Sequence, residues 1–130
     1  MCNLYSMTSN SQAIREIAKV LEDRTGNLQP LPEIYPNTMA PIVRNGTNGR
    51  ELVMARWGML TPPGYLKGHC GVTNIRNPGS AWWKRWEGVA HRCLVPLTAF
   101  SELERLPDGK SRPAWFVRSD GEQLAFFAGI

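Results

Sequence analysis

The sequence has 130 residues, 42% of them hydrophobic, and a net charge of +4, which fits one small globular domain. No run approaches the ~20 apolar residues of a membrane span, and the N-terminus shows no basic-then-apolar leader. These features argue against a membrane or secreted protein, and we expect a cytoplasmic one.

The chain opens on Met1-Cys2, a start with chemistry of its own. Aminopeptidases remove an initiator methionine when the next residue is small, and cysteine is small enough. Cys2 would then carry an amine with a pKa of roughly 7.7–8.0 and a thiol with a pKa of about 8.5, so both would be partly nucleophilic near neutral pH. Such a pair converts an aldehyde first to an imine and then to a thiazolidine, or attacks an acyl group. The alternative is a cysteine that merely follows the start codon.

Residues 9–26 predict an amphipathic helix that packs on a sheet. Its apolar positions recur at helical spacing, at Ile14, Ile17, Ala18 and Leu21. A serine or asparagine at positions 9–11 can cap its start, and Gly26 can end it.

A proline-rich extended segment, residues 27–41, ends in PNTMAP, which predicts a rigid loop. Residues 42–60 predict a β-hairpin, because two apolar runs flank the turn residues Asn45-Gly46 and Asn48-Gly49. Trp57-Gly58 is expected to end the second strand.

The segment GVTNIRNPGS places Asn74 and Arg76 two residues apart, so in an extended chain both side chains leave the same face. An amide beside a guanidinium can bind a phosphate or orient a reacting group. Residues 80–88 predict a short helix, capped by Ser80 and ended by Gly88.

Residues 91–104 begin as a predicted buried strand and include Glu102. Behind an apolar run this carboxylate would be partly desolvated, which would raise its pKa toward the range useful in acid/base steps. The alternative is an exposed glutamate at a strand end.

Two further strands are predicted at residues 112–118 and 124–130, joined by a tight hairpin turn at Asp120-Gly121. The last strand is apolar throughout and needs cover on both faces. We therefore expect a truncated domain that self-associates or takes a partner chain to complete its fold.

Positive charge and tryptophan gather between Arg44 and Arg92. Eight basic residues face two acidic ones in this stretch, which also holds four of the five tryptophans: Arg44, Arg50, Arg56, Lys67, Arg76, Lys84, Arg85 and Arg92, with Trp57, Trp82, Trp83 and Trp86. Cations that track phosphates and rings that stack on unpaired bases suit single-stranded nucleic acid. The alternative is a set of core tryptophans beneath a solvated charged face.

The three cysteines form no disulfide framework. His69-Cys70 and the pair His91 and Cys93 bring histidine close to cysteine, but the spacing is not that of a structural zinc site. We expect no metal and no cofactor, with Cys70 and Cys93 acting as buried small hydrophobes.

In this order the motifs resemble the SRAP family (SOS response-associated peptidase), whose members crosslink to abasic sites in single-stranded DNA. MCNLYS resembles the family's MCGR(F/Y) start, PNTMAP its N-x-A-P loop, and RWGML its W-G-L-x-P segment. TNIR resembles N-A-R, RCLVPLTAFSE resembles R-C-(L/I)-x-P-x-x-G-(F/Y)-x-E, and AFFAGI resembles the A-G-(I/L)-W strand. The likeness covers the first half to two-thirds of a usual family domain. It implies one α+β domain over residues 1–130, with twisted strands in a barrel-like body and a few flanking helices.

The resemblance also implies a site. Cys2 would form the thiazolidine, Asn74 would position the reacting groups, and Glu102 would assist the acid/base steps. Arg76 would contact a DNA phosphate. The groove for DNA would be lined from the PNTMAP loop and the basic, Trp-rich stretch, by Asn37, Pro41, Arg44, Trp57 and Arg85. The partner would be single-stranded DNA with abasic sites, which would make the protein nucleoid-associated when bound. The same nucleophile is linked in the family to autoproteolytic removal of a short leader peptide.

One departure from the family leaves two functions open. The family's catalytic histidine belongs to a later H-x-(R/K)-x-P motif that this sequence does not contain. The chain is either a covalent abasic-site sensor of the DNA damage (SOS) response or a catalytically degenerate module that binds single-stranded DNA. A third hypothesis, a thiol peptidase acting on proteins in trans, lacks a recognisable Cys–His pair and a peptide-binding motif.

Overall fold

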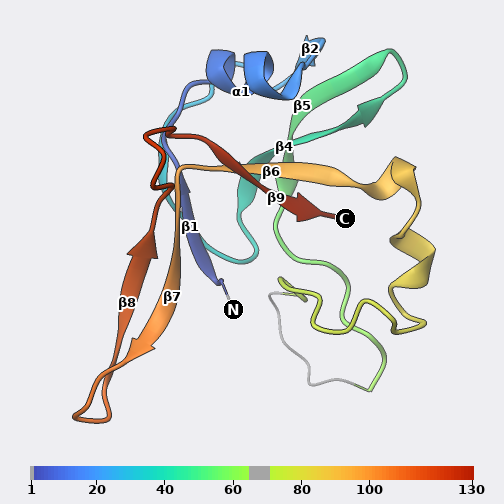
Figure 1. The fold of residues 1–130 in the computed structure, drawn as a ribbon. Coiled ribbons are helices and arrows are strands. Elements are labelled where there is room, and N and C mark those ends of the chain that lie inside the picture. Colours follow the sequence, from blue (N-terminus) through green and yellow to red (C-terminus); the bar gives the residue numbers. More distant parts are fainter. Residues whose placement is uncertain (1, 65–70) are drawn as a thin grey trace.

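The computed structural model describes residues 2–64 and 71–130, which fold into two β-sheets, one α-helix and two short 3₁₀ helices. The first sheet has the order β3 (Leu31–Ile34), β1 (Leu4–Met7), β7 (Ala99–Arg105), β8 (Ser111–Phe116). The second has the order β2 (Glu22–Asp23), β5 (Gly49–Arg56), β4 (Met39–Gly46), β6 (Cys93–Leu97), β9 (Ala125–Gly129). The helices are α1 (Ser11–Ala18), η1 (Lys84–Trp86) and η2 (Val89–His91). The α+β class is confirmed, and the expected barrel-like body takes the form of two sheets with open edges (Figure 1).

The core lies between the two sheets and α1. Tyr5 and Met7 of β1, Ile14 of α1 and Leu52 of β5 are almost completely buried there. The chain passes from one sheet to the other at Thr98, between β6 and β7, where its backbone N–H donates to the carbonyl oxygen of Ser6 (2.8 Å). The N-terminal strand is thus fixed against a segment more than 90 residues away. In the described part of the chain, no helix is long and apolar enough to cross a membrane.

The first helix is shorter than its apolar pattern predicts. Asn10 caps it, accepting a hydrogen bond from the backbone N–H of Ala13, but it ends at Ala18 because Lys19 adopts a left-handed conformation (φ 52°). Leu21, expected on the buried face, is 71% exposed, and Ile17 is 53% exposed. The prediction of a helix to Gly26 was therefore wrong: beyond Lys19 the chain turns into β2, which pairs with β5.

The predicted hairpin is confirmed as β4 and β5, which pair from Met39–Arg56 to Gly46–Gly49. It begins earlier than expected, because the last three residues of PNTMAP already belong to β4. Asn37 forms the preceding turn with a positive φ of 68°, a conformation that asparagine tolerates better than most residues.

Two other predictions fail in the second half of the chain. Residues 80–88 form turns and the three-residue η1 instead of an α-helix. The strands on either side of Asp120-Gly121 do not form a hairpin, because β8 pairs with β7 whereas β9 pairs with β6 in the other sheet. Figure 1 shows these last two strands diverging. They leave a largely apolar cleft whose lining includes Phe100, Phe116 and Phe126.

Candidate functional site

Cys2 lies two residues before Leu4, the first residue of β1, in a position set by strand pairing. Leu4 pairs with Ser101 of β7, which brings the half-buried Glu102 to the same end of the sheet as Cys2. The Cys2 side chain is only 9% exposed, and its thiol donates to the carbonyl oxygen of Leu4 (3.2 Å). The first and seventh strands thus bring together two of the three predicted catalytic residues.

Asn74, the third predicted catalytic residue, is hydrogen bonded to Cys2. Its side-chain Nδ2 donates to the carbonyl oxygen of Cys2 (2.8 Å) and to the hydroxyl of Thr73 (3.0 Å). The Thr73 hydroxyl in turn donates to the side-chain oxygen of Asn3 (3.2 Å). The TNIR segment is therefore tied to the N-terminus across 72 positions of sequence.

Trp57 links the TNIR segment to the first strand. Its indole N–H donates to the carbonyl oxygen of Thr73 (3.4 Å), and its ring meets the Tyr5 ring edge-on at 5.1 Å between centroids. Sequence reasoning missed Asn3, Tyr5 and Thr73. The sequence offered one signal for them: Asn3 and Tyr5 belong to the MCNLYS start, and Thr73 directly precedes Asn74.

Burial raises the pKa of the Cys2 thiol, and the negative charge of Glu102 raises it further, while the hydrogen bond to the Leu4 backbone opposes the shift. The thiol therefore holds its proton more tightly than expected from an ordinary cysteine, and less of it is thiolate near neutral pH. Burial likewise raises the pKa of Cys93 and of Tyr5.

The residues predicted to contact DNA differ in their exposure and in their distance from the Cys2 site. Arg76 is exposed two positions beyond Asn74. Asn37 lies next to the site: its backbone N–H donates to the carbonyl oxygen of Trp57 (2.8 Å), and its side chain accepts from Arg56 (2.8 Å). The prediction that Pro41 lines the groove is wrong, because its side chain is less than 2% exposed and so cannot contact DNA directly.

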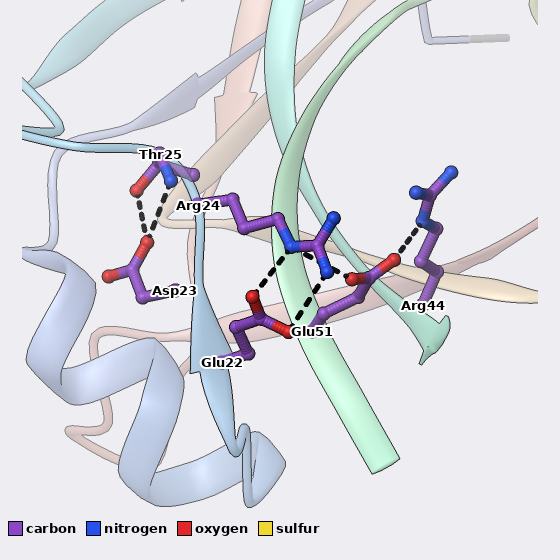
Figure 2. Close-up of polar contacts among 6 residues, drawn as sticks. All are labelled: Glu22, Asp23, Arg24, Thr25, Arg44 and Glu51. Carbon is purple, nitrogen blue, oxygen red and sulfur yellow. Dashed lines mark hydrogen bonds and ion pairs between the residues drawn. The ribbon is translucent and has the colours of Figure 1, made fainter. Parts of the chain in front are cut away.

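Arg44 lies two positions before Gly46, at the end of the β4–β5 hairpin away from Trp57, and its Nε donates to Glu51 (2.6 Å). Figure 1 shows this end of the hairpin away from the N-terminus. A contact of Arg44 with DNA stays a prediction. Glu51 is 5% exposed and also pairs with Arg24 (3.3 Å), so the two arginines approach its carboxylate from opposite sides (Figure 2). Arg24 also pairs with Glu22 (2.9 Å).

The sequence left open whether the tryptophans at positions 82, 83 and 86 belong to the core or to a basic, aromatic surface. The structure shows both. Trp83 is a core residue, only 7% exposed. Arg85 is exposed, and its guanidinium lies over the rings of Trp82 (3.9 Å) and Trp86 (4.5 Å), an arrangement favoured by cation–π attraction. Lys67, His69 and Cys70 lie outside the described residues, as does Met1.

In the part of the chain that the structure describes, no three His, Cys, Asp or Glu side chains gather where they could hold a metal ion. Cys93 is half-buried at the start of β6. The arrangement around Cys2 offers instead a nucleophile, a neighbouring carboxylate and an amide that holds the backbone.

Fold and site together define a two-sheet α+β protein built around a cysteine near its N-terminus, held by an asparagine from a distant segment. The model of the SOS response associated peptidase (SRAP) family matches residues 1–130, and the chain belongs to that family. The resemblance inferred from the motifs is therefore confirmed. The family's name associates it with the SOS response, a response to DNA damage.

A crystal structure of a protein from Bordetella bronchiseptica, solved in a structural genomics programme, shares the fold with a TM-score of 0.66 and 20% sequence identity. The match covers 98% of this chain and 62% of that one. At this identity the likeness extends to the fold alone. A search of curated proteins finds no match.

Proposed function

We propose that this protein senses abasic sites in single-stranded DNA and links to them covalently through Cys2 after removal of Met1. The observation that carries the proposal is the hydrogen bond from Asn74 to the Cys2 carbonyl oxygen, because it ties the TNIR motif to a residue that has both of the required nucleophiles. Membership of the SRAP family supports a role in the response to DNA damage.

The reaction joins the open-chain aldehyde of an abasic sugar to Cys2 in two steps. The α-amine adds to the aldehyde carbon, and loss of one water gives an imine. The sulfur then adds to the imine carbon, forming the C–S bond, while the thiol proton is transferred to nitrogen. The product is a five-membered thiazolidine, and no oxidant or reductant is needed.

The neighbouring residues have distinct roles in this proposal. Glu102 accepts the thiol proton and returns it to the imine nitrogen, a step that matters because the pKa of the thiol is raised. Asn74 fixes the backbone carbonyl of Cys2 and hence the direction of the amine. Arg76, exposed beyond Asn74, contacts a phosphate of the bound strand.

A denaturing gel tests the proposal. The purified protein is incubated with a single-stranded oligonucleotide that carries one abasic site, and intact mass identifies any shifted band. We expect an adduct with the wild-type protein and with Cys93→Ala, a matched loss of the other described cysteine. Cys2→Ala should bind the DNA without an adduct. Crosslinking that persists in Cys2→Ala would overturn the assignment.

The second candidate is a module that binds single-stranded DNA without covalent chemistry. The 9% exposure and raised pKa of Cys2 favour it. The mass of the N-terminus separates the two functions, because a retained Met1 blocks the amine and excludes thiazolidine formation. Affinity for the oligonucleotide with no adduct, in protein that has lost Met1, would support this second candidate.

A further inference from the structure

A cleft rich in arginine lies at the opposite end of the β4–β5 hairpin from Trp57. It is lined by residues 43–45 of β4, Arg50 of β5 and residues 92–94 at the start of β6. We refer to it as the arginine cleft. Seven residues of extended chain separate Arg50 from Trp57, which at roughly 3.3 Å per residue puts Arg50 about 20 Å from Trp57.

Strand pairing creates the cleft. β4 pairs with β5 as far as Gly46, but with β6 only at Val43 and Arg44, since β6 begins at Cys93. Beyond Arg44 that side of β4 faces η2 instead of a strand. The side-chain Nδ2 of Asn45 donates to the carbonyl oxygen of Val89 (3.3 Å) and so holds η2 beside the hairpin. The opening is thus bounded by hydrogen-bonded elements on both sides.

The cleft keeps a positive charge. Arg50 donates to the carbonyl oxygen of Ala18 (2.7 Å), and Arg92 donates to that of Glu87 (3.1 Å). These partners orient the side chains but carry no net charge. A guanidinium has five N–H donors, so one bond of this kind leaves donors for a ligand.

Arg44 is partly neutralised, because Glu51 pairs with it and also with Arg24. Glu22, paired with Arg24, adds a second carboxylate to the neighbourhood. The four arginines Arg24, Arg44, Arg50 and Arg92 still outnumber these two carboxylates, so the surface attracts an anion with more than one charge.

We propose that the arginine cleft binds the phosphodiester backbone of single-stranded nucleic acid, as a contact surface separate from the Cys2 site. Separated guanidiniums match successive phosphates of one strand better than they match a single small anion. The choice of nucleic acid as ligand rests on the proposed function. A strand bound at Cys2 would have to extend several nucleotides beyond the abasic site to reach the cleft.

Oligonucleotide length and two arginine substitutions test this proposal. Binding is measured in a Cys2→Ala background with single strands of about 4 and about 16 nucleotides, lengths that bracket common single-strand sites. Arg50→Gln/Arg92→Gln should weaken binding of the longer strand about tenfold. It should also reduce the magnitude of its salt slope by about 1.4, from two lost contacts of about 0.7 each. The shorter strand should bind unchanged.

Arg112→Gln is the matched control, since it removes an arginine from β8, where it pairs with Glu104 (2.9 Å). A double variant that folds and keeps its affinity and salt slope for the longer strand would overturn the proposal, as would an equal loss in Arg112→Gln. Crosslinking of the shorter strand to the wild-type protein reports on Cys2 alone, so failure of the cleft and failure of the proposed function are distinguishable.

If the double variant does not fold, chemical modification of arginines in the wild-type protein tests the same proposal. Phenylglyoxal reacts with accessible arginines, and peptide mass locates the products. The longer strand should protect Arg50 and Arg92, whereas inorganic phosphate at the same phosphate concentration should not. Protection by inorganic phosphate alone would identify a simple anion site, and absence of protection by the strand would also overturn the proposal.

Discussion

The two ends of the β4–β5 hairpin both hold polar groups at the edge of the core, but with different kinds of contact. At the Trp57 end the bonds that tie the TNIR segment in place are between neutral groups: an indole and an amide donate to backbone carbonyl oxygens, and the amide also donates to a hydroxyl. At the other end a buried carboxylate, Glu51, is held by two arginines. The neutral end thus holds the backbone of Cys2 through Asn74, whereas the charged end carries the excess of positive charge.

The neutral end should depend most on Trp57. Trp57→Ala removes the edge contact with Tyr5 and the bond to Thr73, and we expect it to lower the free energy of unfolding by about 3 kcal/mol. Trp57→Phe keeps the ring contact and should lose about 1 kcal/mol, the cost of the missing hydrogen bond. Urea unfolding measures both. Equal losses in the two variants would mean that the hydrogen bond, and not the ring packing, holds this end.

The charged end should depend on the carboxylate of Glu51. Glu51→Gln leaves two arginines without their shared partner, and we expect a loss of about 2 kcal/mol, less than for a fully buried pair because both arginines are about half exposed. Glu104→Gln, which breaks the exposed pair with Arg112, is the matched control and should cost under about 0.5 kcal/mol. A Glu51→Gln variant as stable as this control would contradict the proposed importance of the buried carboxylate.

Asn74 offers a smaller test of the neutral end. Asn74→Ala removes the bond to the Cys2 carbonyl oxygen and should lower the free energy of unfolding by about 1 kcal/mol. Asn74→Asp keeps the shape but turns the donor into an acceptor, so it should lose more at neutral pH and recover as the pH falls and the carboxylate is protonated. If the Asp variant shows no pH dependence relative to wild type, the amide does not donate to Cys2.

The smallest expected effect is on the titration of Cys2. Alkylation of this thiol, followed by peptide mass, should rise with pH at a higher midpoint than that of an ordinary cysteine. Glu102→Gln removes a negative charge that raises the pKa of Cys2, so the midpoint should fall; Glu104→Gln is the control that should leave it in place. Because the thiol pKa is raised by folding, its contribution to stability is full below the unfolded pKa and is lost as pH rises through the folded one. An unchanged midpoint in Glu102→Gln would show that its charge does not reach Cys2.

The sequence predicted correctly the elements that depend on a few neighbouring residues. The paired turn signals around Thr47 fixed the hairpin, and the cap at Asn10 marked the start of α1. The end of α1 was missed because Lys19, which has no intrinsic preference for a left-handed conformation, takes the place usually filled by glycine.

Long-range pairing was beyond the reach of local patterns. The turn residues Asp120-Gly121 suggest a hairpin, yet β8 and β9 find different partners because β7 and β6 already offer edges in separate sheets. Among the site residues, the spacing of Asn74 and Arg76 drew attention to the segment that does contact Cys2. The basic composition between Arg44 and Arg92 did not reveal that Arg44 and Arg50 lie at the opposite end of the hairpin from Trp57.

The pairing of Leu4 with Ser101 has a consequence for biosynthesis. The strand that encloses Cys2 cannot form until about 100 residues have been made, which takes roughly 5–20 s at roughly 5–20 residues per second. Once it has left the ribosome, the nascent N-terminus stays open to a methionine aminopeptidase until folding closes over it. The proposed chemistry requires excision of Met1. The order of translation leaves a time window for this excision, which ends when β7 is added to the sheet.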